Sequence, residues 1–234
     1  MRKGVKHFET VLANQEAQVL EMVHGKKSTC IQEALKHIPH PEKIEKVCMD
    51  MCSSFAHAVQ NALPHAEIIT DRFHLVRHLN KHLNTRRKSS HAQLDKGQRK
   101  RFSRIHFLLS KNDLKLGKDD RRTVADYLRL NPKIKPLYKL AQRFKQEVLN
   151  KDWKNVQEAA QSLRTWVDDA RKAFPDFVKT VEKWWQPVLN ACLFKESNGR
   201  MEGMNQKIKL IKRQGFGYPE RELFKLKVMA AFNP

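Results

Sequence analysis

The sequence predicts a mixed α/β protein in which a short α/β part is followed by a long helical part and a closing C-terminal helix. Three observations support this class. Short apolar runs bounded by turn residues dominate positions 1–85, as expected for alternating strands and helices. Near Thr85 the chain becomes dense in Arg and Lys. From there to about residue 190, apolar residues recur at helical spacing.

The first elements are expected to be two strands paired as a β-hairpin over residues 5–23. The turn Ala13-Asn14-Gln15-Glu16 separates their apolar residues. Ser28 is expected to cap a helix that ends before Pro39. The buried face of that helix is expected to carry Ile31, Leu35 and Ile38.

Two further strands are each expected to end at an aspartate. A run rich in apolar residues precedes Asp50, and Glu67-Ile68-Ile69-Thr70 precedes Asp71. Ser53 is expected to cap a helix between them. Ligands of open α/β sheets collect beyond the carboxyl ends of the strands, so the two carboxylates form a candidate divalent-metal site. An alternative explanation is that each aspartate is an ordinary turn residue or a helix N-cap, since aspartate is common at both positions.

A basic region follows the long helix that is expected after Asp71. The chain is dense in Lys and Arg from Arg86 to Arg104, which makes this run a candidate phosphate-contacting surface. A solvated helix face explains the same pattern equally well. The four tryptophans are expected to pack between the helices that continue to about residue 190.

The overall charge favours a polyanionic partner. The chain holds 46 Lys+Arg against 25 Asp+Glu, for a formal net charge of +21. Nucleic acid is favoured over membrane, because no segment approaches the run of about 20 apolar residues that spans a bilayer. The four cysteines lack the paired spacing of a zinc ribbon or a disulfide framework, and no signal peptide is visible. A reducing cytoplasm is therefore expected.

The last segment predicts an amphipathic helix that begins at Ser197-Asn198-Gly199. Met201, Met204, Ile208 and Ile211 form its apolar stripe. Glu202 lies on a neighbouring stripe and is expected to border the buried face, although a glutamate in a first turn also simply complements the helix dipole. The helix is expected to stop before the sharp break at residues 215–219.

Three blocks of the sequence resemble the transposases of the ISL-three family of bacterial insertion sequences. They are Cys48-Met49-Asp50-Met51 with Ser53 and Phe55, the run from Leu63 to His74, and the run from Ser197 to Tyr218. The resemblance covers nearly the whole chain. It implies a DDE transposase, with an RNase H-like core interrupted by a large helical insertion before the final catalytic Glu. The implied divisions are an RNase H-like portion over 1–85, a basic helical insertion over 86–190, and a C-terminal helix of the core over 191–234.

The resemblance implies DNA strand cleavage and strand transfer with two Mg²⁺ or Mn²⁺ ions held about 4 Å apart by carboxylates. Asp50 matches the second Asp of the triad and Glu202 matches the Glu, so both are expected to be catalytic metal ligands. Asp71 and His74 match an acid-x-x-His element that is expected to support the site. An alternative assignment makes Asp50 and Asp71 the first two acids.

One departure from the family pattern concerns the first Asp, which the family carries on a strand just upstream of a segment like Arg2-Lys3-Gly4. That strand and its Asp are expected to be missing, since Glu9, Glu16 and Glu21 are misplaced for the role. We therefore expect a truncated and inactive transposase, with a non-catalytic basic DNA-binding remnant as the alternative.

The expected partners are DNA, as transposon ends and target, and a second copy of the chain. Neither a membrane nor a small-molecule substrate is expected, and the location expected is the bacterial cytoplasm, at the nucleoid. The residues expected to contact DNA are Arg86, Arg87, Lys88, Arg99, Lys100, Arg101, Lys209, Lys212 and Arg213.

Overall fold

The computed structural model describes residues 8–194 and 199–233. The chain divides into two compact units, Met1–Asp71 with Glu196–Pro234 and Arg72–Lys195, which we call unit 1 and unit 2. The expected mixed α/β class with a large helical portion is confirmed. The Arg2-Lys3-Gly4 segment and the helix-start residues Ser197 and Asn198 lie outside the described residues.

Unit 1 begins with the expected hairpin. Strands β1 (Glu9–Ala13) and β2 (Val19–His24) pair antiparallel, with Val11 opposite Met22. The turn between them is closed by Asn14, whose side-chain oxygen accepts a hydrogen bond from the Gln18 amide at 2.9 Å. The hairpin is one of two separate two-stranded sheets among the described residues.

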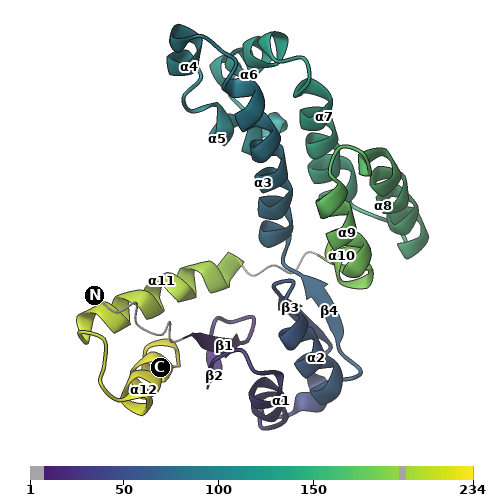
Figure 1. Cartoon of the computed structure of the whole chain (residues 1–234). Coiled ribbons are helices and arrows are strands. Elements are labelled where there is room, and N and C mark those ends of the chain that lie inside the picture. The colour runs from purple at the N-terminus through teal and green to yellow at the C-terminus, as the bar shows by residue number, and fades with distance from the viewer. Residues whose placement is uncertain (1–7, 195–198, 234) are drawn as a thin grey trace. The chain divides into compact units, whose positions relative to one another are not determined.

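The second sheet is parallel and is assembled around a crossover helix. After α1 (Ser28–Lys36) and the short η1 (Pro41–Lys43), strand β3 (Lys46–Met49) leads through α2 (Ser53–Ala62) to β4 (Glu67–Thr70). Figure 1 shows α2 connecting β3 and β4. The order of strand, helix and strand matches the prediction, and both strands stop one residue before an aspartate.

The two serines that were expected to cap helices do not occupy the N-cap positions. Lys27 and Cys52 hold those positions, and neither makes a side-chain cap hydrogen bond. Ser28 and Ser53 are instead the first helical residues. The sequence prediction was therefore wrong by one residue, an error typical of helix boundaries.

Two C-terminal helices complete unit 1. Helix α11 (Gly199–Gln214) buries Met204 and Ile208 and packs Met201 and Ile211 beside them, which confirms the predicted apolar stripe. Helix α12 (Arg221–Phe232) was not predicted. The residues that form the shared core with the hairpin are Val19, Met22, Met204, Ile208, Phe224 and Val228. Residues near the two ends of the sequence thus build one core.

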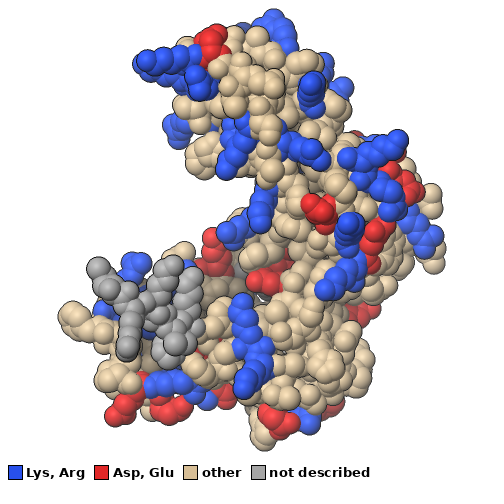
Figure 2. Space-filling view, viewed as in Figure 1, with Lys and Arg blue, Asp and Glu red and all other residues tan. Residues whose placement is uncertain are grey.

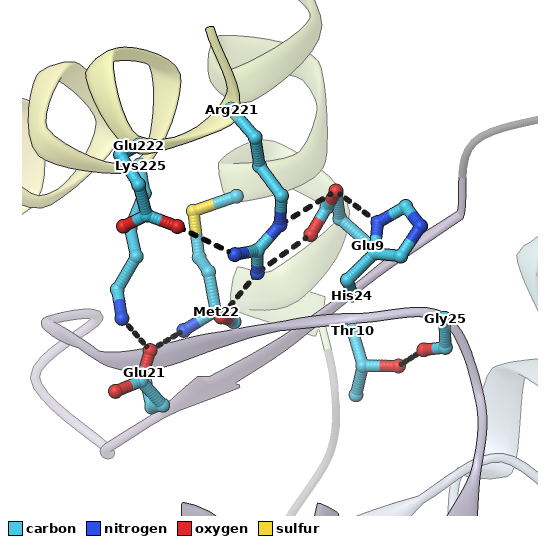
Figure 3. Close-up of polar contacts among 9 residues, drawn as sticks. All are labelled: Glu9, Thr10, Glu21, Met22, His24, Gly25, Arg221, Glu222 and Lys225. Atoms are coloured by element: carbon cyan, nitrogen blue, oxygen red, sulfur yellow. Dashed lines mark hydrogen bonds and ion pairs between the residues drawn. The ribbon is translucent and has the colours of Figure 1, made fainter. Parts of the chain in front are cut away.

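Polar contacts join α12 to the hairpin (Figure 3). Arg221 donates to both carboxylate oxygens of Glu9 at 3.4 Å and to the carbonyl of Met22 at 3.0 Å. One of these Glu9 oxygens also lies 3.0 Å from the His24 ring. Lys225 forms an ion pair with Glu21 at 2.5 Å.

The described part of unit 2 is entirely helical. Its long first helix is α3 (Arg72–His91), and Arg72 donates to the carbonyls of Ala191 and Phe194 at 2.7 and 2.9 Å. Arg72 thus caps the C-terminal end of the last helix of unit 2. The remaining elements are α4 (Lys96–Arg101), α5 (Ile105–Ser110), η2 (Asp113–Lys115), α6 (Lys118–Leu130), α7 (Lys135–Arg143), the π-helical η3 (Phe144–Leu149), α8 (Val156–Ala170), α9 (Pro175–Lys183) and α10 (Trp185–Leu193).

Aromatic residues form the centre of unit 2. Trp166 is fully buried, lies 4.5 Å from Phe144 and 5.8 Å from Phe177 between ring centroids, and donates to the Leu140 carbonyl. The prediction that tryptophans pack between helices is confirmed for this residue and for Trp184, which is 8% exposed. Across the described parts of both units, each helix is too short or too polar to span a bilayer.

Candidate metal centre

Two aspartates meet because the strands before them are parallel and in register. Met49 is opposite Thr70 at the ends of β3 and β4, so the next residues, Asp50 and Asp71, leave the sheet at the same end. A hydrogen bond of 2.9 Å from the Asp71 amide to the Met49 carbonyl extends the pairing to this point. Asp71 is 2% exposed, whereas Asp50 is half-buried.

The chain turns sharply after each aspartate and enters a helix. The Cys52 amide donates to the Asp50 carbonyl at 2.7 Å, and α2 begins at the following residue. Helix α3 begins directly after Asp71. Each carboxylate therefore lies beside a helix N-terminus, whose partial positive charge offsets part of the repulsion between two close negative charges.

His74 completes a group of three potential metal ligands. It lies in the first turn of α3, three residues after Asp71. One potential ligand atom from each of Asp50, Asp71 and His74 lies within 4.8 Å of the other two. No other such group of three or more occurs in the described ranges 8–194 and 199–233. Two carboxylates and one imidazole form a donor set for a divalent cation, in which the carboxylate oxygens suit Mg²⁺ and Mn²⁺ and the imidazole suits transition metals.

Glu202 stands apart from this group. It lies in the first turn of α11, where Met201 and Met204 point to the core and the glutamate side chain is exposed. The prediction that this side chain borders the buried face is therefore wrong. Its assignment as a metal ligand stays a prediction.

The N-terminal glutamates have structural partners. Glu9 is tied to Arg221 and His24, and Glu21 is tied to Lys225 (Figure 3). The Glu9 side chain is 15% exposed. Both residues hold α12 onto the hairpin, a role that no local sequence pattern indicated because the partners are about 200 positions away.

The basic residues predicted to contact DNA differ in exposure. Arg86 and Lys88 are exposed near the end of α3, while Arg87 is 9% exposed and donates to the Asn84 side chain at 2.8 Å. Arg101 is exposed and pairs with Asp126 at 2.5 Å. Figure 2 shows many Lys and Arg side chains around the α4 and α6 part of unit 2. The other predicted contacts are all exposed: Arg99, Lys100, Lys209, Lys212 and Arg213.

Comparisons with known proteins identify the class of this chain as a transposase. The family model DDE_Tnp_ISL3, described as a transposase, matches residues 1–228. Because the match covers almost the whole chain, the protein belongs to the ISL-three (ISL3) transposase family, as its sequence motifs predicted.

The chain is also similar to the transposase for insertion sequence element IS1001 from Bordetella parapertussis. The two are 24% identical over 241 residues, which cover 99% of this chain and 59% of the relative. The chain thus spans about three-fifths of the length of that curated relative. No solved structure matches the chain significantly.

Proposed function

We propose that this chain carries metal-binding residues for the chemistry of an insertion-sequence transposase, the cleavage of DNA strands and their transfer to a target; the expectation that the chain is inactive stays a prediction. The grouping of Asp50, Asp71 and His74 at the ends of two parallel strands carries this proposal, since it occurs in a member of a DDE transposase family. Residues 1–85 and 191–234 would then form an RNase H-like core, and residues 86–190 a helical insertion. The place of action would be the bacterial nucleoid.

Asp50 and Glu202 are the proposed metal ligands. Bound Mg²⁺ or Mn²⁺ supplies a polarised nucleophile and stabilises the leaving oxygen of the phosphodiester. Asp50 would hold the cation through a carboxylate oxygen, and Asp71 and His74 would orient Asp50 or serve as further ligands. The short distances between Asp50 and Asp71 equally support direct ligation by Asp71, which is the alternative assignment of the two acids.

DNA is the proposed partner, bound as transposon ends and target. The net charge of +21 and the exposed basic residues of α4 and α11 support this assignment. Contacts to phosphates by such residues bind any base sequence and weaken as salt rises. A second copy of the chain is a further proposed partner, since strand transfer joins two DNA segments.

A second candidate is a non-catalytic DNA-binding protein. The observation that favours it is the position of Glu202, which is exposed on α11 and does not belong to the Asp50–Asp71–His74 group. In that case the basic residues would bind DNA, and the chain would not cleave it.

Nicking of supercoiled plasmid DNA in Mg²⁺ or Mn²⁺ distinguishes the two functions. The chain is compared with Asp50→Asn, Asp71→Asn and Glu202→Gln, and with Glu16→Gln as a control in the exposed hairpin turn. Catalysis predicts metal-dependent nicking that is lost in Asp50→Asn and Glu202→Gln and kept in the control. Salt-sensitive DNA binding without nicking by any of the proteins would establish the non-catalytic function instead.

A further inference from the structure

The turn between α11 and α12 presents one aromatic ring to solvent. Phe216 lies at its tip and is 101% exposed, whereas the next most exposed large apolar side chain, Leu114, is 69% exposed. This ring contributes no burial to the core of unit 1. Singly exposed apolar side chains are common on protein surfaces, so the conformation and surroundings of the ring must carry any assignment of a partner.

The backbone of this turn adopts a conformation that bulky residues rarely adopt. Phe216, Gly217 and Tyr218 have φ values of 49°, 101° and 49°. Left-handed backbone is sterically unfavourable for residues with a Cβ atom, and aromatic residues at such positions are outliers. Backbone outliers of this kind are found where the surrounding structure enforces them, and they concentrate at functional sites.

Hydrogen bonds and packing fix the turn. The amides of Phe216 and Gly217 donate to the carbonyls of Arg213 and Lys212 at 3.0 and 2.9 Å, which closes the end of α11. The Tyr218 ring packs 5.5 Å from the Phe224 ring, and it lies so close to Gly215 that a Cβ atom there would overlap it. The exposed ring is therefore carried on a rigid base, so little conformational entropy is lost when it makes a contact.

Three basic residues shortly precede Phe216 in the sequence. Lys212 and Arg213 occupy the last turn of α11 and are exposed, and Lys209 is exposed one turn earlier. The nearest acid beyond the turn, Glu220, is the residue just before α12. An aromatic ring flanked by cations is the arrangement that binds nucleic acid strands, with the ring stacked on a base and the cations beside the phosphates.

We propose that Phe216 stacks on a nucleobase of DNA that is unpaired or distorted, while Lys212 and Arg213 hold the adjacent phosphates. This inference rests on the proposed function in requiring DNA as the partner, and it adds a base-stacking contact outside the metal centre. A lipid surface or a protein is a competing occupant, because an exposed aromatic ring near basic residues also suits these. The charge of the chain and the three neighbouring cations favour DNA.

Binding of oligonucleotides that contain 2-aminopurine tests the proposal. Three proteins are compared: the wild-type chain, Phe216→Gly and the control Leu226→Ala, which truncates an exposed apolar residue on α12. Glycine removes the ring and relieves the left-handed backbone, so this variant is expected to fold at least as well as the wild type. We expect Phe216→Gly to weaken binding to single-stranded DNA by about 5- to 150-fold and to abolish fluorescence quenching of the base.

The salt dependence separates stacking from charge. Phe216→Gly removes no cation, so the slope of log affinity against log salt should equal that of the wild type, whereas Lys212→Ala should reduce the slope by about one unit. Equal affinity and quenching for wild type and Phe216→Gly would overturn the stacking proposal while leaving DNA binding intact. Failure of the wild type to bind DNA at low salt would overturn the proposed function as well. Loss of binding to anionic lipid vesicles but not to DNA in Phe216→Gly would assign the ring to a membrane surface.

Discussion

The carboxamide of Asn233 pairs with both backbone polar groups of Val19. The Val19 amide donates to Asn233 Oδ1 at 3.0 Å, and Asn233 Nδ2 donates to the Val19 carbonyl at 2.8 Å. These residues are 214 positions apart, and Val19 is fully buried. The side chain at the end of α12 thus supplies the partners that a neighbouring strand would otherwise supply to β2.

Replacing Asn233 with alanine should destabilise unit 1. The change leaves a buried N–H and a buried carbonyl of Val19 without their partners, which costs about 1–3 kcal/mol in the free energy of unfolding. Urea denaturation followed by circular dichroism measures this cost. Lys227→Ala, an exposed change on the same helix, is the control. Equal stability of Asn233→Ala and the control would show that water replaces the carboxamide without loss.

Two glycine substitutions should have opposite effects. A Cβ at Gly215 would overlap the Tyr218 ring, whereas a Cβ at Gly203 in α11 meets nothing within 4 Å. Gly215→Ala should therefore lower the free energy of unfolding by about 1–3 kcal/mol through overpacking. Gly203→Ala should raise it by up to about 1 kcal/mol, because alanine favours a helix interior. Thermal melts of the two variants and the wild type give the comparison, and a stabilising Gly215→Ala would contradict the packing described for Tyr218.

Unit 2 should lose stability as the pH falls below about 6.5. His78 and His82 lie one helical turn apart on α3, with their Nε2 atoms 3.3 Å from each other. Burial lowers the pKa of both rings from 6.5; for His78 the nearby His82 lowers it further, and for His82 Asp176 opposes the shift. The unfolded chain therefore binds more protons than the folded chain below that pH, and the free energy of unfolding falls as acid is added.

Thermal melts between pH 7.5 and 5.0 check this dependence. The double variant His78→Gln/His82→Gln should show a flatter profile than the wild type. A residual slope is expected from His91, whose pKa burial also lowers. An unchanged profile in the double variant would assign the acid sensitivity to other groups.

Manganese should stabilise the wild-type chain through the Asp50 site. A ligand that binds only the folded state at 100 times its Kd adds about 2.7 kcal/mol to the free energy of unfolding. Asp50→Asn and Asp71→Asn should lose most of this gain, while Glu16→Gln should keep it, because Glu16 lies in the exposed hairpin turn. Titration of Mn²⁺ against the midpoint of thermal unfolding supplies the measurement. A gain that persists in Asp50→Asn would mean that the ion binds elsewhere.

Local patterns predicted much of unit 1. The apolar run before Asp50 and the stripe from Met201 to Ile211 each depend on residues within a few positions, so periodicity alone indicated a strand and a helix. The convergence of Asp50 and Asp71 was also expected, since the carboxyl ends of parallel strands meet at one edge of a sheet.

Long-range contacts explain what the sequence did not predict. Arg87 belongs to a basic run, yet its guanidinium is buried beside Asn84 because tertiary packing decides which member of such a run faces inward. The roles of Arg221 and Asn233 depend on Glu9 and Val19, whose distance along the chain hides them from any local pattern. Glu202 is exposed on α11 because Met204 and Ile208 of the same helix face the core.

The pairing of Asn233 with Val19 has a consequence for biosynthesis. Unit 2 is a continuous stretch of chain, so its packing partners are made one after another, whereas the hairpin of unit 1 obtains its core partners only when α11 and α12 have been made. Loop closure over some 200 residues is slow compared with local helix formation. Until α11 and α12 have been synthesised, Val19 and Met22 of the hairpin remain exposed to water. Chaperones would be required during this period.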